Sequence, residues 1–196
     1  IKPIIILALA KFWSSNQPTW GNIAKSMLII LPVEILIFRQ PDLGTTLTIA
    51  MIWLSILIGA NVSFFKLLAI ILVSLIFAPI VWIFLKDYQK YRIISFVFPE
   101  KDPLGVGYNA IQSTIAVGSG GLSGRGLGRG TQSRLQFLPE FRTDFIFASI
   151  AEEFGFLGSA VVLVLYGFIL MRLLRIVSYL RQNRFASLVI LGVMSM

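Results

Sequence analysis

The sequence contains no histidine and no cysteine, which narrows the chemistry that its polar residues can perform. Disulfides, thiol nucleophiles, Ser-His-Asp triads and the usual zinc sites are excluded. Any general base must therefore be Asp, Glu, Lys or Tyr. Asp144 is the first candidate, because it lies where a long polar stretch ends and an apolar run begins. A carboxylate at that position can accept a proton from a substrate hydroxyl or bind a metal ion.

The same position has a structural interpretation. Thr143 or Asp144 can serve as the N-cap of the helix that the apolar run predicts. A carboxylate there also interacts favourably with the positive end of the helix dipole. Capping and catalysis therefore both remain open for Asp144.

A glycine-rich segment precedes Asp144 and is accompanied by arginines. Residues 118–130 read GSGGLSGRGLGRG. Such a segment can bring backbone N–H groups close to phosphate, or it can be a flexible turn. We expect four guanidinium groups to favour an anionic, phosphate-bearing ligand, and the substrate-binding candidates are Arg125, Arg129, Arg134 and Arg142. A phospholipid-like ligand fits a loop between membrane spans better than nucleic acid does.

Three further acids are secondary candidates. Glu34 and Glu152 fall inside apolar runs, where ionisable groups are costly and often functional. Each can instead form a structural ion pair, and we expect Glu34 to pair with a cation. In one continuous helix, Glu152 would lie about 80° around and about 12 Å along from Asp144. Asp42 lies in a short turn between two apolar runs, where capping is the simpler interpretation.

Composition indicates a membrane protein. The chain of 196 residues is 57% hydrophobic and only 13% charged, whereas soluble domains are about 45–50% apolar and about 25% charged. An all-α polytopic membrane protein is therefore expected, with helices at the apolar segments 4–13, 26–38, 43–60, 64–85, 145–171 and 185–196. Residues 86–144 carry half of the charged residues and most of the glycines, and we expect them to form one large loop.

The chain is predicted to form a single integral membrane domain over residues 1–196. It begins with Ile1 rather than Met and stops inside an apolar run, so we expect a piece of a longer protein. The short connection between the last two apolar segments should be cytoplasmic, because its charged residues are all basic: Arg172, Arg175, Arg181 and Arg184. Counting spans back from it places the 86–144 loop outside the cytoplasm.

Several motifs in order resemble the SEDS family, which includes RodA, FtsW and SpoVE. They are QPDLGT (40–45), YQKYR (88–92), DPLGVGYNAIQSTIAVGSGG (102–121), GRGTQSRLQFLPE (128–140), RTDFIF (142–147) and AEEFGFLG (151–158). The ordered set is far more specific than any one motif. The GTQS and FLPE contexts are similar to the elongation branch, RodA, rather than to the division branch, FtsW.

The resemblance implies ten spans in the bacterial cell (inner) membrane, with both ends in the cytoplasm. It implies a peptidoglycan glycosyltransferase that polymerises lipid II on the outer side, with a class B penicillin-binding protein and other elongation-complex membrane proteins as partners. The essential Asp of the family falls on Asp144. Many relatives have a histidine directly before Thr-Asp, where this chain has Arg142. No cofactor is required by this pattern, and a divalent cation, Mg²⁺ or Mn²⁺, is the candidate.

Three alternatives stay open. A lipid II flippase fits broken helices and the intramembrane acids Glu34 and Glu152. A division-type FtsW-like protein has the same chemistry in another assembly. A scaffold that only recruits a penicillin-binding protein would not need Asp144 at all.

Overall fold

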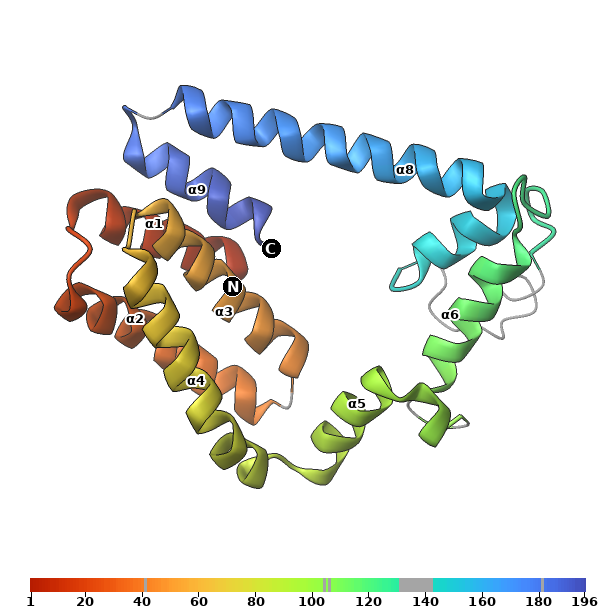
Figure 1. The fold of residues 1–196 in the computed structure, drawn as a ribbon, viewed down its shortest axis with the longest axis horizontal. Coiled ribbons are helices and arrows are strands. Elements are labelled where there is room, and N and C mark those ends of the chain that lie inside the picture. The colour runs from red at the N-terminus through yellow and green to blue at the C-terminus, as the bar shows by residue number, and fades with distance from the viewer. Residues whose placement is uncertain (41, 104, 106, 131–142, 181) are drawn as a thin grey trace. The chain divides into compact units, whose positions relative to one another are not determined.

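The computed structural model describes residues 1–40, 42–103, 105, 107–130, 143–180 and 182–196, and every regular element among them is a helix (Figure 1). The predicted all-α fold is confirmed. The helices are α1 (Lys2–Ser15), α2 (Trp20–Arg39), α3 (Leu43–Gly59), α4 (Phe64–Phe84), α5 (Asp87–Val97), η1 (Pro99–Lys101), α6 (Tyr108–Ser119), α8 (Ile146–Tyr179) and α9 (Arg184–Met194). They divide into two compact units, one made of Ile1–Phe84 with Ile169–Met196 and the other of Leu85–Phe168.

The first unit has its core where α1, α3 and α9 pack together. Its fully buried side chains include Leu9, Trp13 and Ile56. Gly192 lets α9 approach closely, because a Cβ atom there would contact Ile6 at 2.7 Å. Polar bonds between helices are few in this apolar setting. Trp53 Nε1 donates to Ser26 Oγ at 3.0 Å, which satisfies an indole N–H that the core would otherwise leave unpaired.

Helices α2, α3 and α9 of the first unit begin at side-chain caps. Thr19 Oγ1 accepts from the Asn22 N–H at 3.4 Å before α2. Asn183 Oδ1 accepts from the Ala186 N–H at 3.1 Å before α9. Such caps satisfy backbone donors that the first helical turn leaves open, so local sequence fixes where these helices start.

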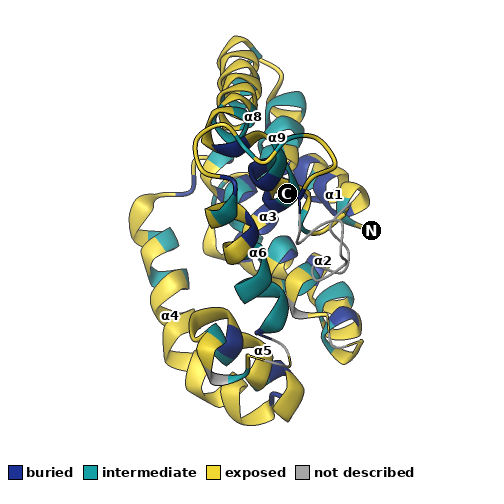
Figure 2. Ribbon diagram, turned by 90° about the vertical axis from the view of Figure 1, so that its right-hand side faces the viewer, coloured by how far each residue is buried: buried dark blue, intermediate teal, exposed yellow. Residues whose placement is uncertain are grey.

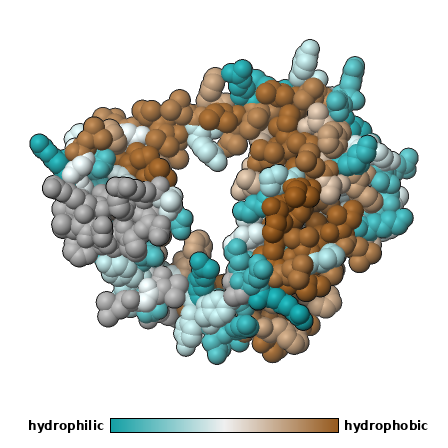
Figure 3. Space-filling model, turned by 180° about the vertical axis from the view of Figure 1, so that it is seen from behind, coloured by the Kyte–Doolittle hydropathy of each residue, from teal (hydrophilic) through white to brown (hydrophobic). Residues whose placement is uncertain are grey.

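Among the described residues, the three helices α2, α4 and α8 are long and apolar enough to cross a membrane. Every residue of α4 from 71 to 84 is exposed (Figure 2). A helix that is apolar all round and unburied is typical of a membrane span. Apolar side chains also cover much of the molecular face in Figure 3. The chain is therefore a membrane protein, as its composition predicts.

The second unit contains the polar stretch that the sequence marks as one large loop. Part of this stretch is helical. Gln89 is buried, and its Oε1 accepts from the Lys86 N–H at 3.0 Å at the start of α5. Helix α6, Tyr108–Ser119, also lies within this stretch.

Helix α8 differs from the span expected at 145–171. It begins at Ile146, continues to Tyr179, and is interrupted at Gly155, where φ is 68° and ψ is −161°. Only glycine adopts this combination readily. The helix therefore consists of a short first segment, 146–154, and a long second segment, 156–179.

Candidate functional site

Asp144 lies in a turn two residues before α8 begins, and its side chain is exposed. It lines a cleft of about 480 Å³ together with residues of α6 and of the start of α8. The structure therefore places this carboxylate where a ligand can reach it. No capping bond from Asp144 is found among the described residues, so the capping interpretation gains no support.

Helix α6 forms the opposite wall of the cleft. Ser113 and Thr114 of this helix line it, and both carry hydroxyl groups. Each hydroxyl donates to the Ala110 carbonyl, at 2.8 Å from Ser113 and 2.9 Å from Thr114. Their oxygen lone pairs remain available to accept hydrogen bonds from a ligand. We name this site, lined by Asp144 on one wall and by the two hydroxyls on the other, the Asp144 cleft.

The two walls of the cleft are held together by small residues. Ala116 of α6 and Ala148 of α8 are both buried and belong to one apolar cluster, against which Phe145 packs. Two alanines allow the helix backbones to approach closely. Asp144 therefore stands directly beside the contact that fixes the width of the cleft.

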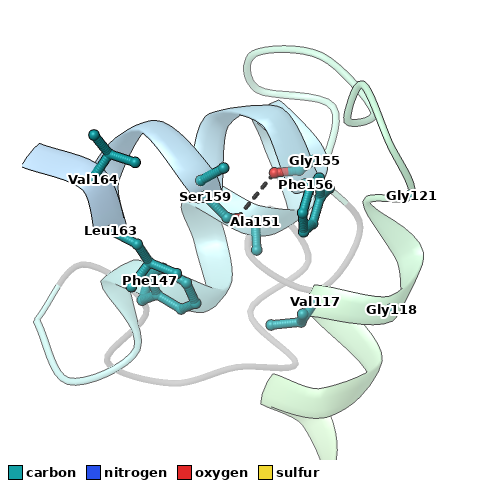
Figure 4. A pocket seen from close by; sticks show the side chains of 11 residues that line it. Val117, Gly118, Gly121, Phe147, Ala151, Gly155, Phe156, Ser159, Leu163 and Val164 are labelled. Carbon is teal, nitrogen blue, oxygen red and sulfur yellow. Dashed lines mark hydrogen bonds between the residues drawn. The ribbon is translucent and has the colours of Figure 1, made fainter.

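A second, mostly apolar cleft of about 560 Å³ adjoins the first (Figure 4). Val117, Gly118 and Phe147 line both clefts. The apolar cleft then runs along α8, past the interruption at Gly155, as far as Val164. Together the two clefts offer one polar and one apolar surface side by side.

The glycine-rich segment is inserted into the interruption of α8. In an unbroken helix, the Glu152 and Glu153 carbonyls would accept from the N–H groups of Phe156 and Leu157. Here the glycine-rich segment supplies a partner for each of these four groups. Two of its N–H groups donate to the carbonyls: Arg125 N–H to Glu152 O and Gly126 N–H to Glu153 O, both at 3.0 Å. Two of its carbonyls accept from the N–H groups: Gly121 O from Phe156 N–H at 2.8 Å and Leu122 O from Leu157 N–H at 3.2 Å. We call residues 121–126 the splint.

The splint explains how an apolar helix can be broken without loss of hydrogen bonding. Non-helical backbone at membrane depth is tolerated only where its polar groups are satisfied by protein or water. The close fit also requires glycine. A Cβ atom at Gly120 would overlap the Ala151 carbonyl, and one at Gly124 would overlap the Glu153 carbonyl.

This arrangement corrects one interpretation of the glycine-rich segment. The N–H groups of Arg125 and Gly126 are already bonded to α8, and the Gly128 N–H donates to Glu153 Oε1 at 3.1 Å. These three groups are therefore not free to cradle a phosphate, and the segment is not a loose turn either. Its glycines allow close backbone packing.

The four arginines are only partly placed. Arg125 and Arg129 are exposed, and Arg125 Nε donates to the Ser119 carbonyl at 3.2 Å. Neither lines the Asp144 cleft. Arg134 and Arg142 lie outside the described residues. The prediction that some of these arginines bind a phosphate-bearing substrate stays a prediction.

The secondary acids have different surroundings. Glu152 is fully buried and lies within the short helical segment that follows Asp144. Since Asp144 precedes α8, the position of Glu152 relative to Asp144 that we expected for one continuous helix does not apply. Glu34, in α2, has its Oε2 atom buried without a hydrogen bond in the described part of the chain, so the pairing that we expected is not formed at that atom. Asp42 caps α3 as expected, accepting from the Thr45 N–H at 3.1 Å.

A metal ion finds no complete site in the part of the chain that the structure describes. No group of three acidic side chains there lies close enough to hold one. Asp144 is the single acid among the described residues that line its cleft. The divalent cation suggested by the sequence stays a prediction.

Sequence reasoning missed Ser113, Thr114 and the interruption of α8. The hydroxyls lie in the IQSTIAVGSGG run, where their spacing from Asp144 carries no signal. The interruption had a signal in Gly155, a glycine two residues after the acid pair Glu152 and Glu153 inside an apolar run. An isolated glycine within a helical pattern often marks a close backbone approach.

Comparison with known proteins identifies the family. A family model described as a cell cycle protein family, for FtsW, RodA and SpoVE, matches residues 1–196. The chain belongs to this family. It is the SEDS family that the ordered motifs resemble, so that prediction is confirmed.

Members of the SEDS family with curated names are similar over most of the chain. Peptidoglycan glycosyltransferase MrdB of Escherichia coli (strain K12) is 43% identical over 175 residues, which is 87% of this chain and 47% of the relative. A probable peptidoglycan glycosyltransferase FtsW of Thiomicrospira cyclica is 36% identical over 98% of this chain and 51% of the relative. Stage V sporulation protein E of Bacillus subtilis (strain 168) is 36% identical over 100% of the chain and 54% of its own length. The chain spans about half the length of these SEDS relatives.

Proposed function

We propose that this chain belongs to a peptidoglycan glycosyltransferase that polymerises lipid II into glycan strands, with Asp144 as the catalytic base. The observation that carries the proposal is an exposed carboxylate in a cleft that two hydroxyl-bearing residues of α6 also line. Relatives that are named peptidoglycan glycosyltransferases give the reaction class. The GTQS and FLPE contexts in the sequence favour the elongation role over division.

The proposed reaction is a glycosyl transfer with inversion. The 4-hydroxyl oxygen of the acceptor sugar attacks the anomeric carbon of the donor. A new C–O bond forms as the bond from that carbon to the pyrophosphate oxygen breaks, and the lipid pyrophosphate leaves with the bonding electrons. Asp144 accepts the hydroxyl proton, which is the task of a general base held within hydrogen-bond reach of the nucleophile.

The hydroxyls of Ser113 and Thr114 would orient the sugar. They accept hydrogen bonds from sugar hydroxyl groups across the cleft from Asp144. Holding the acceptor hydroxyl near the carboxylate contributes through proximity and orientation. The adjoining apolar cleft offers a surface for the lipid part of the substrate.

Charge on the departing pyrophosphate needs compensation. Arginine suits this task because its planar guanidinium group binds phosphate oxygens in a bidentate manner. Arg142 is two residues from Asp144 in sequence and is our first choice, with Arg134 second. Such groups stabilise charge that develops in the transition state.

The orientation and partners follow from the same proposal. The basic residues near the end of α8 and the start of α9 favour the cytoplasmic side, and Asp144 would then face outside the cytoplasm, where wall synthesis occurs. A class B penicillin-binding protein would supply crosslinking of the new strand. Other membrane proteins of the elongation complex would complete the assembly.

The test is a polymerisation assay with purified full-length protein and lipid II, with and without its penicillin-binding partner. The proposal predicts glycan strands without any ion gradient. Failure of the complex to polymerise lipid II would contradict it. A scaffold, in contrast, would support wall synthesis equally well after Asp144→Ala.

A lipid II transporter is the second candidate, and the interrupted α8 favours it. Discontinuous helices commonly form substrate sites in transporters, and Glu152 is fully buried next to the interruption. Reconstituted vesicles distinguish the two functions. A transporter would move labelled lipid II between leaflets without forming polymer, whereas the glycosyltransferase forms polymer in detergent, where there is no second leaflet.

A further inference from the structure

The glycine-rich splint connects the two walls of the Asp144 cleft. Helix α6 ends at Ser119, and the chain passes within a few residues into the splint. The splint is bonded on one side to the short segment of α8 that follows Asp144 and on the other side to the long segment. The spacing of the two walls therefore depends on how firmly the splint is held.

One side chain fastens the end of this segment. Glu153 Oε1 accepts from the Gly128 N–H at 3.1 Å, two residues beyond the last splint residue. Glu153 also offers its backbone carbonyl to Gly126. The same residue thus binds the glycine-rich segment at two points, once through the backbone and once through the side chain.

We infer that Glu153 is a positioning residue for the glycosyl transfer, acting through the glycine-rich segment rather than on the substrate. It does not line the Asp144 cleft. Its carboxylate fastens Gly128, the splint then holds α6 against the start of α8, and Asp144 keeps its place opposite Ser113 and Thr114. The expected effect on the reaction rate rests on the proposed function. The hydrogen bond between Glu153 and Gly128 does not depend on it.

The bond requires an acceptor atom, not a charge. Glu153→Gln keeps an Oε1 atom that accepts from Gly128, whereas Glu153→Ala removes the acceptor. The inference therefore predicts different behaviour for the two variants. A role in binding a cation or in relaying protons would predict that both variants fail.

The experiment uses the full-length protein in complex with its penicillin-binding partner. Polymerisation rate is measured over a range of lipid II concentrations, and hydrogen exchange is measured by mass spectrometry on peptides that cover residues 121–129. Glu100→Ala is the matched control, since Glu100 is an exposed acid of η1 in the same unit. This control should match the parent in both measurements.

For Glu153→Ala we expect kcat to fall by about tenfold or more, because small displacements of reacting groups reduce the rate steeply. KM should change much less, since Glu153 does not line the Asp144 cleft. Exchange over residues 121–129 should become faster. Glu153→Gln should restore both kcat and protection to near the parent values.

Two results would overturn the inference. One is parent-like kcat and exchange in Glu153→Ala, and the other is a loss of kcat in Glu153→Gln as large as that in Glu153→Ala. If Glu153→Ala does not accumulate in the membrane, Glu153→Gln alone decides: near-parent kcat and protection support the inference, and a large loss of kcat overturns it. The hydrogen-exchange measurement separates this inference from the proposed function. An active Asp144→Asn variant would refute the catalytic role of Asp144. The faster exchange in Glu153→Ala would still be expected in that case.

Discussion

Gly155 and Gly124 meet backbone to backbone: a Cβ atom added to Gly155 would overlap the amide nitrogen of Gly124. Gly155 also has a positive φ of 68°, a conformation that side chains disfavour. The close backbone contact and the positive φ both occur at Gly155, where the splint enters α8. Glycine is therefore needed at this position for two independent reasons.

We expect Gly155→Ala to destabilise the protein by about 1–3 kcal/mol or more, because strain at a positive φ adds to the backbone overlap. Thermal unfolding of the purified full-length protein measures this. Gly167→Ala is the matched control in the same helix, since no atom outside its neighbours lies within 4 Å of the added Cβ. An unfolding temperature for Gly155→Ala equal to that of the control would contradict the splint geometry.

Much of the fold follows from hydrophobic pattern. All six apolar segments are helical, and Asp42 caps α3 as the sequence predicts. Periodicity and capping are local properties, so a single sequence is enough to find them. The helices α5 and α6 are harder to predict from the sequence, because they are short and lie in a polar stretch.

The splint could not be predicted in the same way. It joins residues 121–126 to 152–157 through backbone groups, and backbone groups carry no sequence identity. The glycines are the only signal of the splint in the sequence, and they are equally compatible with a flexible turn or a phosphate-binding loop. Asp144 was found because it is a lone acid at a helix start, whereas Ser113 and Thr114 become candidates only when α6 is seen beside it.

Removing the hydroxyls of the Asp144 cleft should weaken substrate binding. Ser113→Ala and Thr114→Val each remove one acceptor, and one hydrogen bond contributes about 0.5–1.5 kcal/mol. We expect KM for lipid II to rise by roughly two- to tenfold for each variant, with insertion unchanged. Steady-state kinetics of polymerisation provide the check.

Ser119→Ala is a useful comparison for these variants. Ser119 is in the same helix, and its hydroxyl donates to the Ala116 carbonyl at 2.9 Å, but it does not line the cleft. Its KM should stay at the parent value. Equal effects from all three substitutions would show that the hydroxyls act on α6 itself and not on a ligand.

The orientation of the chain can be tested by labelling. The sequence has no native cysteine, so a single introduced thiol gives a clean signal. Ser123 and Ser178 are both exposed. We expect Ser123→Cys to react with a membrane-impermeant thiol reagent in intact cells and Ser178→Cys to react only after lysis. The reverse pattern would place Asp144 on the cytoplasmic side and exclude wall synthesis at this site.

The arginines can be ranked by substitution. We expect Arg142→Ala or Arg134→Ala to lower kcat/KM for lipid II by roughly tenfold or more, equivalent to about 1.4 kcal/mol or above. Arg→Lys should restore only part of this, since lysine keeps the charge but loses the bidentate geometry. Arg129→Ala tests an exposed arginine that does not line the cleft. Parent-like kinetics in all the alanine variants, Arg125→Ala included, would show that the pyrophosphate is bound elsewhere.

The most direct measurement is lipid II polymerisation by Asp144→Asn, made in the full-length protein with its penicillin-binding partner. The substitution keeps the size of the side chain and removes its basicity. Asp87→Asn, an exposed acid at the start of α5, is the matched control and should polymerise at the parent rate. If Asp144 is the base, the Asn variant inserts, binds its partner and forms no detectable glycan strands. Glycan strands made at a near-parent rate by that variant would contradict the catalytic assignment.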